Sequence, residues 1–415
     1  MKLMVLTAAL CALALPVLAQ DSLNCRQRGH WAPPYSSGSQ AVTVDTTRTL
    51  VFIHVWVWPE DPMDYDNKVY TLDVANPDQP LPVGPSLQFP DEVFTMHYEA
   101  GMLYVVSAAP VGDVLWVYDV TDVAHPELLG HCDIPDAEEA YGLAVSGDLV
   151  FAVVPGTPGG DVRIISVSDP RNPVEIAAWS LPGYAFDIAI AGNLAFITGF
   201  LDSLFWVVDV TAPQSPVVLG STRLTEEALG VAVAGNHAYL SGDKLFVVDI
   251  SNPQSPVEVA SHPVRFESYY LAVRDNLVYL PAGGAGLRVF DVSNPEDPTE
   301  VGYYTRASRT CFWDVAVMGN LAFVADDGLR TIEFLGAGVE DQRGAPVARP
   351  ALGLRPNPAR NRVRLVGTES AVLYGPDGRK VAVLRPGENC VARLPRGVYF
   401  FRLATGRPNR LVLVR

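Results

Sequence analysis

The sequence predicts an all-β chain: a seven-bladed β-propeller closed by an N-terminal strand, followed by a small C-terminal immunoglobulin-like β-sandwich. Three observations lead to this prediction. The 415 residues include 34 Gly and 34 Pro and only 18% charged residues, a composition too interrupted for long helices. A strand-and-turn pattern recurs about every 43 residues, which is the spacing typical of propeller blades. The net charge changes sign near residue 350, which indicates two independent units.

The N-terminus has the pattern of a secretory signal peptide over residues 1–19. Lys2 opens a short basic region, an apolar run follows, and Val17-Leu18-Ala19 fits a small-residue cleavage site. No other long apolar run occurs, so we expect no membrane span after signal removal. The expected location is secreted or attached to the outer-membrane surface, reached through the periplasm.

Each copy of the repeat contains a strand that ends in Asp and runs into a turn with Pro, as in VDISNP and FDVSNP. The residues at this position are Asp73, Asp119, Ser166, Asp209, Asp249, Asp291 and Glu333. We expect the recurring Asp to cap the turn, because a binding site would need it in one copy only. Pairs such as Gly235-Asn236 join the first two strands and supply the positive φ angles of a two-residue hairpin turn.

The strand count leaves one position open. First, second and third strands occur seven times each, but the outer strand occurs six times, because a linker follows Phe334. Arg26 to Trp31 (RQRGHW) resembles the outer strand Glu127 to Cys132 (ELLGHC). We therefore expect this N-terminal strand to complete the seventh blade and to remove free sheet edges.

With the copies laid out, LFVVDISNPQSPVEVASH and LRVFDVSNPEDPTEVGYY resemble the LVIVD repeats of bacterial secreted and surface propellers. The resemblance covers roughly Leu23 to Leu335, and it implies a propeller over residues 20–336 but no catalytic residues. The chain departs from the pattern at Ser166 and in the seventh copy, which lacks the Pro turn.

Residues 353–415 carry 13 basic and 3 acidic side chains, a net charge of +10, whereas the first 352 residues carry −26. Residues 337–352 are predicted to be a linker, because they are rich in Gly, Pro and Ala and lack an apolar period. The C-terminal motifs LRPNP, VLYGPDGRKV and LPRGVYFFRL are similar to the sorting domain of the type IX (Por) secretion system. That resemblance implies that secretion machinery recognises residues 353–415. The alternative is an accessory immunoglobulin-like module without a sorting role.

Several function classes are disfavoured. The acidic balance argues against nucleic acid as a partner. The chain has no G-x-S-x-G, H-E-x-x-H, Walker or G-x-G-x-x-G motif in a suitable context. Signal removal leaves Cys25, Cys132, Cys311 and Cys390, whose spacing matches no metal or redox motif and leaves three disulfide pairings open.

Acidic and aromatic residues gather in the loops that share one face of a propeller. They predict a cation-attracting, aromatic-lined site whose candidate residues are Trp58, Asp61, Asp64, Asp66, Tyr141, Tyr184, Phe266 and Trp313. Four residues of one loop offer oxygen ligands suited to Ca²⁺, although the EF-hand Gly and distal Glu are missing: Asp61, Asp64, Asp66 and Asn67. No other cofactor is expected. The alternative is a solvated acidic rim with aromatic residues packed between blades.

The expected function is that of a non-catalytic binding or scaffold module, secreted or held at the cell surface, with a surface ligand or protein as its partner. The alternative is a propeller hydrolase or lyase with a metal-assisted site on the acidic loop face. A tight cluster of three or more carboxylates would favour the enzyme, whereas a dispersed ring of acids would favour binding.

Overall fold

The computed structural model describes residues 21–336, apart from 35, 58–65, 110–111, 135–139, 155–160, 265–267 and 306–310, and seven strands between 353 and 413. The chain divides into two compact units, Met1–Gly338 and Val339–Arg415. All elements in the described residues are β-strands, and none of these residues forms an apolar helix long enough to cross a membrane.

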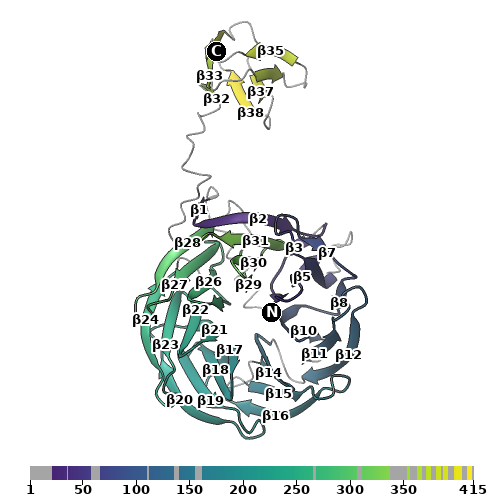
Figure 1. The fold of residues 1–415 in the computed structure, drawn as a ribbon, viewed down its shortest axis with the longest axis vertical. Helices are drawn as coiled ribbons and strands as arrows, with labels where there is room; N and C mark the ends of the chain where they lie inside the picture. Colours follow the sequence, from purple (N-terminus) through teal and green to yellow (C-terminus); the bar gives the residue numbers. More distant parts are fainter. Residues whose placement is uncertain are drawn as a thin grey trace. The chain divides into compact units, whose positions relative to one another are not determined.

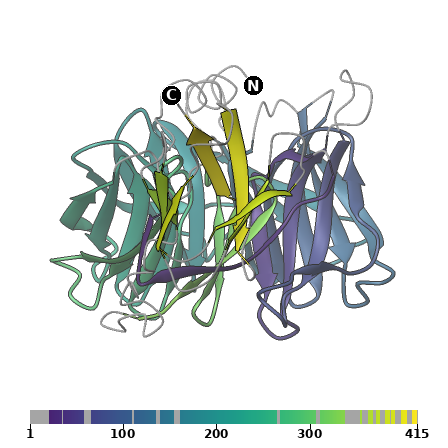
Figure 2. The same cartoon turned by 90° about the horizontal axis from the view of Figure 1, so that it is seen from above.

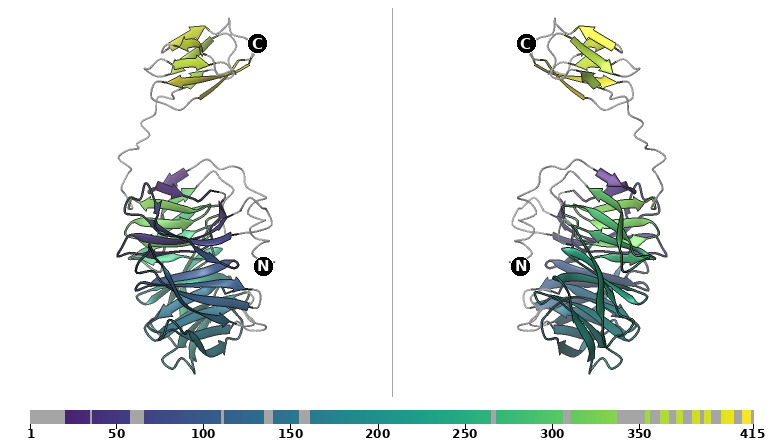
Figure 3. Two further views of the ribbon diagram at one scale, coloured as in Figure 1. Left: turned by 90° about the vertical axis from the view of Figure 1, so that its right-hand side faces the viewer. Right: turned by 90° about the vertical axis from the view of Figure 1, so that its left-hand side faces the viewer.

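The first unit contains seven antiparallel sheets arranged in a ring, so the predicted all-β, seven-bladed propeller is confirmed (Figure 1). Figures 2 and 3 show the ring from its side, with the strands of each blade lying next to one another. Within a blade, consecutive strands pair from the centre of the ring outward.

The strands can be grouped by their place in the blade. The innermost strands of blades one to seven are β4 (Val42–Asp45), β9 (Val93–Glu99), β13 (Gly142–Ser146), β17 (Tyr184–Ala191), β21 (Ala228–Ala234), β25 (Ala272–Arg274) and β29 (Val315–Met318). The second strands are β5 (Leu50–Val57), β10 (Met102–Ala109), β14 (Leu149–Val154), β18 (Leu194–Phe200), β22 (His237–Gly242), β26 (Leu277–Pro281) and β30 (Leu321–Ala325).

The outer half of each blade follows the same order. The third strands are β6 (Asp66–Asp73), β11 (Gly112–Asp119), β15 (Asp161–Ser166), β19 (Leu204–Asp209), β23 (Lys244–Asp249), β27 (Leu287–Asp291) and β31 (Leu329–Phe334). The outer strands of blades two to six are β12 (Glu127–Ile134), β16 (Val174–Ser180), β20 (Val217–Arg223), β24 (Val257–Pro263) and β28 (Thr299–Thr305). Two short strands, β7 (Leu81–Pro82) and β8 (Leu87–Phe89), pair with β6 in blade one.

The N-terminal segment runs along three blades. β1 (Asp21–Leu23) pairs with β28, β2 (Cys25–Trp31) pairs with β31 as the fourth strand of blade seven, and β3 (Ser36–Gly38) pairs with β5. Figure 1 shows the purple β1 and β2 beside the green β28 and β31.

The hydrophobic core lies between blades. The described residues form seven buried clusters, and each cluster combines side chains from two adjacent sheets. One of them packs Phe323 and Leu329 of blade seven against Val51 and Ile53 of blade one, so the first and last blades share a core like any other pair. Burial of this apolar surface at every blade interface is the main contribution to stability.

The repeated Asp caps a turn, as predicted. In five copies its Oδ1 accepts a hydrogen bond of 2.8 Å from the backbone N–H two residues later: Asp73, Asp119, Asp209, Asp249 and Asp291. The turn then packs against the outer strand of the preceding blade. At Gly29 in β2, an added Cβ would lie 2.4 Å from the carbonyl oxygen of Pro77, so only glycine allows this approach.

The second unit contains two small antiparallel sheets. One has the strand order β32 (Gly353–Arg355), β33 (Arg362–Val366) and β36 (Gly387–Cys390). The other has the order β35 (Lys380–Leu384), β34 (Ala371–Tyr374), β37 (Gly397–Leu403) and β38 (Asn409–Leu413). The predicted linker, residues 337–352, lies outside the described residues.

Candidate functional site

Aromatic side chains from blades on opposite sides of the ring meet near the starts of the inner strands. Tyr141 and Phe186 stack with ring centroids 4.9 Å apart, and Phe186 lies 6.3 Å from Tyr269. Tyr269 in turn lies 5.3 Å from Trp313, and Phe94 lies 6.5 Å from Tyr141. These contacts join blades two, three, four, six and seven, so the cluster spans the centre of the ring. We call Phe94, Tyr141, Phe186, Tyr269, Tyr270 and Trp313 the central aromatic cluster.

Two acidic residues beside this cluster connect neighbouring inner strands. The Oδ1 and Oδ2 atoms of Asp187 accept hydrogen bonds of 2.8 and 2.9 Å from the backbone N–H groups of Ile188 and Val231. Val231 belongs to β21 of the next blade. Because its two oxygens accept hydrogen bonds from the backbones of two adjacent blades, the Asp187 carboxylate links these blades structurally.

Asp314 repeats the same arrangement at the junction of blades seven and one. Its Oδ1 accepts a hydrogen bond of 2.7 Å from the N–H of Val315, and its Oδ2 accepts one of 2.8 Å from the N–H of Val42 in β4. The two acids occupy the same place in their copies of the repeat, FDIAIAGN and WDVAVMGN.

Burial dominates the ionisation of these groups. It raises the pKa of Asp187 to about 7 and that of Asp314 to about 6, although the backbone N–H groups favour the charged forms. Burial, with the charges of Asp187 and Asp314, also raises the pKa of the Tyr270 hydroxyl well above its usual value. The centre of the ring therefore holds acids that titrate near neutral pH beside half-buried aromatic rings.

The structure brings together two of the predicted aromatic site residues. Tyr141 and Trp313 belong to the central aromatic cluster, whereas Tyr184 begins β17 and is 37% exposed. Trp58 and Phe266 lie outside the described residues. Phe186, Asp187 and Asp314 were not predicted from the sequence. The Asp shared by FDIAIAGN and WDVAVMGN was the signal that could have identified the two acids.

The proposed Ca²⁺ loop is described only at its end. Asp61 and Asp64 lie outside the described residues. Asp66 pairs with Lys68, with 2.6 Å between Oδ2 and Nζ, and the buried Asn67 has its Oδ1 3.3 Å from Nε2 of His54. Both residues thus have protein partners, and calcium binding by this loop stays a prediction.

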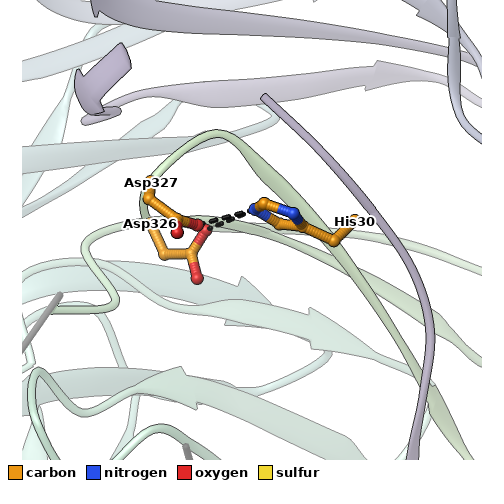
Figure 4. A group of neighbouring side chains, drawn as sticks. All are labelled: His30, Asp326 and Asp327. Carbon is orange, nitrogen blue, oxygen red and sulfur yellow. Dashed lines mark hydrogen bonds and ion pairs between the residues drawn. The ribbon is translucent and has the colours of Figure 1, made fainter. Parts of the chain in front are cut away.

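A second polar group joins the N-terminal strand to blade seven (Figure 4). Nε2 of His30 in β2 lies 2.7 Å from Oδ1 of Asp327 and 3.9 Å from Oδ1 of Asp326, both in the turn between β30 and β31. Arg330 donates hydrogen bonds to both carboxylates. Burial raises the pKa of Asp326 to about 7, and the hydrogen bond that the protonated Asp326 can donate to the Asp327 carboxylate adds to the shift. Asp326 and Asp327 are adjacent in the sequence and lie in one loop of the predicted acidic face, but His30 lies almost 300 residues away and gave no signal.

The fold defines this chain as a repeat-built, seven-bladed β-propeller. More particularly, four of its segments match the model of the LVIVD repeat: residues 182–223, 227–263, 268–306 and 312–332. The propeller therefore contains LVIVD repeats, and the matched copies lie in blades four to seven.

Two solved structures are similar to the chain. The crystal structure of Saccharomyces cerevisiae Sqt1 matches with a TM-score of 0.52 and 8% identity, over 76% of this chain and 100% of that chain. The crystal structure of the computationally designed Ika8 protein matches with a TM-score of 0.49 and 12% identity, over 74% of this chain and 98% of that chain. At this identity the likeness to Sqt1 shows the fold alone. No curated protein matches the chain.

Proposed function

We propose that this propeller is a non-catalytic binding module that captures a cationic ligand or a basic protein segment at the central aromatic cluster. The observation that supports this proposal is that aromatic rings from five blades meet beside Asp187 and Asp314 at the centre of the ring. Phe94 and Phe186 are buried in this cluster, whereas the rings of Tyr141, Tyr269 and Trp313 are half-buried. Aromatic faces attract cations, and carboxylates strengthen that attraction.

The overall charge supports the same class of ligand. The first 352 residues carry a net charge of −26, which concentrates cations and basic partners near the propeller. Binding rather than turnover is favoured because Asp187 and Asp314 each engage both oxygens with backbone N–H groups. A hydrolase or lyase needs carboxylates that are free to exchange protons with a substrate.

The binding proposal is tested with a panel of basic, neutral and acidic peptides, whose affinities are measured by calorimetry at low and physiological salt. We expect the basic peptides to bind most tightly, and more weakly as salt rises. Trp313→Ala should weaken binding by about five- to thirtyfold, the loss expected when a cation–aromatic contact of about 1–2 kcal/mol is removed. Leu128→Ala, at an exposed position of the outer strand β12, is the matched control and should leave the affinity unchanged.

Two results would refute the proposal. One is equal affinity of Trp313→Ala and the unaltered protein for every peptide. The other is hydrolysis of a sugar, ester or lactone panel that is lost on replacing carboxylates of the propeller, which would establish the hydrolase alternative.

We also propose that the chain is exported and that its N-terminal strand closes the ring. The signal-peptide pattern of residues 1–19 and the similarity of residues 353–415 to a sorting domain support export to the cell surface or beyond. The two small antiparallel sheets of the second unit fit an immunoglobulin-like sandwich of the kind that such a domain would need.

Ring closure by β2 has three supporting contacts. The strand pairs with β31 from Cys25 to Trp31, with one register shift between Gln27 and Gly29. Arg28 bonds Glu333 of blade seven at 3.0 Å and Asp78 of blade one at 3.0 Å. Gly29 lies against Pro77 in the turn that follows β6 of blade one. One strand thus contacts both the last and the first blade.

A further inference from the structure

The group formed by His30, Asp326 and Asp327 has the donors of a metal site. One possible ligand atom from each residue lies within 4.8 Å of the other two, so a small adjustment would bring all three around one ion. The set combines one imidazole nitrogen with two carboxylate oxygens. Such a mixed set is used by Zn²⁺ and similar divalent transition metals, often with water in the remaining positions.

The surrounding residues hold the donors in place. Nε and Nη2 of Arg330 both contact Oδ2 of Asp326, whereas Oδ1 of the same carboxylate faces His30 (Figure 4). The turn itself is anchored from the N-terminal side, because Ser39 donates from its N–H to the carbonyl oxygen of Asp326 and from Oγ to that of Gly328. Arg330 therefore orients Asp326 in the way that outer-shell partners orient metal ligands.

Charge and access also suit a cation. Two carboxylates face one guanidinium, so the ionised group keeps one negative charge that a divalent ion would compensate. The side chain of Asp326 is fully buried, whereas those of His30 and Asp327 are 30% and 26% exposed. The ion can thus enter from solvent and contact a carboxylate in the interior.

Another outer strand also carries a histidine at the position of His30, but no matching pair of carboxylates is described beside it. His131 in β12 occupies the place of His30 in the outer strand of blade two. It pairs with Trp116 in β11 and packs against the indole ring at 5.4 Å. His131 is therefore a matched control for any effect of an outer-strand histidine.

We propose that His30, Asp326 and Asp327 bind one divalent transition-metal ion, of the Zn²⁺ class, at the junction of the N-terminal strand and blade seven. The bound ion would cross-link β2 to the turn between β30 and β31. This site is independent of the central aromatic cluster and gives the ring a metal-dependent closure.

The test uses the full chain without an affinity tag. Equilibrium dialysis against Zn²⁺ should give one ion per chain, and thermal unfolding should shift upward with Zn²⁺ because the ion binds only the folded site. In His30→Ala and in Asp327→Asn, the affinity for Zn²⁺ should fall at least about tenfold, and the thermal shift at the same Zn²⁺ concentration should be lost. In His131→Ala, both the binding of Zn²⁺ and the thermal shift should persist. Circular dichroism verifies that each variant keeps its β-sheet signal.

The identity of the ligands is tested with Co²⁺. The visible spectrum should show ligand-field bands without thiolate charge transfer, because the donors are nitrogen and oxygen. Thiolate bands would assign the ion to cysteine and overturn the proposal. Equal Zn²⁺ binding by His30→Ala and the unaltered chain, or equal loss in His131→Ala, would do so as well. Failure here would leave the peptide-binding proposal intact, since that test depends on Trp313.

Discussion

The hydroxyl of Tyr270 donates a hydrogen bond of 2.9 Å to the backbone carbonyl oxygen of Tyr141. The first residue precedes β25 of blade six and the second precedes β13 of blade three, so this bond crosses the ring. Blades on opposite sides of a propeller do not share a sheet or an interface. A direct bond between them therefore ties the two halves of the ring at its centre.

Tyr270→Phe tests the contribution of this bond. The substitution keeps the aromatic ring but leaves the carbonyl of Tyr141 without this donor, which typically costs about 1–3 kcal/mol in a buried setting. We expect a lower midpoint in denaturant unfolding. Tyr184→Phe, whose side chain is 37% exposed, is the control and should change stability by less than about 0.5 kcal/mol. An unchanged midpoint for Tyr270→Phe would show that the cross-ring bond adds nothing.

The buried acids predict a pH dependence of stability. Asp187 and Asp314 have pKa values raised from 3.8 to about 7 and about 6. Between pH 4 and 7 the folded state therefore binds more protons than the unfolded state, and the free energy of unfolding contributed by these acids falls as pH rises. Their contribution is full below their unfolded pKa and is lost as pH passes the folded values.

Asp187→Asn isolates this effect because the amide does not ionise. The stability of the variant relative to the unaltered protein should improve as pH rises from 5 to 8, with a slope of at most about 1.4 kcal/mol per pH unit. Asp209→Asn is the control, because hydrogen bonds from Thr211 lower the pKa of the exposed Asp209 and its carboxylate therefore stays ionised in both states from pH 5 to 8. The stability difference between this variant and the unaltered protein should not change with pH in that range. A difference between Asp187→Asn and the unaltered protein that stays constant across this range would contradict the assignment.

Deletion of the N-terminal strand tests ring closure. A chain that begins at Pro33 lacks β2 and exposes the edge of β31, so we expect a lower unfolding temperature and aggregation. A chain that begins at Asp21 keeps β1 and β2 and serves as the control. Light scattering and thermal unfolding measure the two effects. If both chains unfold at the same temperature without aggregation, β2 does not close the ring.

Removal of the C-terminal unit tests its sorting role. A chain that ends at Gly336 should fold, because every core cluster of the propeller lies before that residue. In a host with the type IX machinery we expect this chain to stay unsecreted. A carrier protein fused to residues 337–415 should be exported. Secretion of the shortened chain at the level of the full chain would rule out the sorting role.

Part of the molecule could be predicted from local patterns. The hairpin residues Gly192 and Gly235 both have φ of 59°, and the Asp249 carboxylate caps its turn with a bond to the N–H of Ser251. Such features depend on residues within a few positions of one another. The same turn residues recur in most copies of the repeat, so one sequence provides several independent examples of each turn. The candidate aromatic residues Tyr141 and Trp313 were predicted from the gathering of acidic and aromatic residues in the loops that share one face of a propeller.

The repeat, the number of blades and the chemistry of the turns follow from the sequence alone, because they depend on short-range periodicity and backbone preferences. Which distant side chains meet depends on how the blades pack. Asp187 contacts the backbone of Val231, Tyr270 reaches Tyr141, and His30 meets Asp327 from the other end of the propeller. These contacts form because the curvature of the ring brings distant blades together, and that curvature arises from packing between sheets rather than from any one segment.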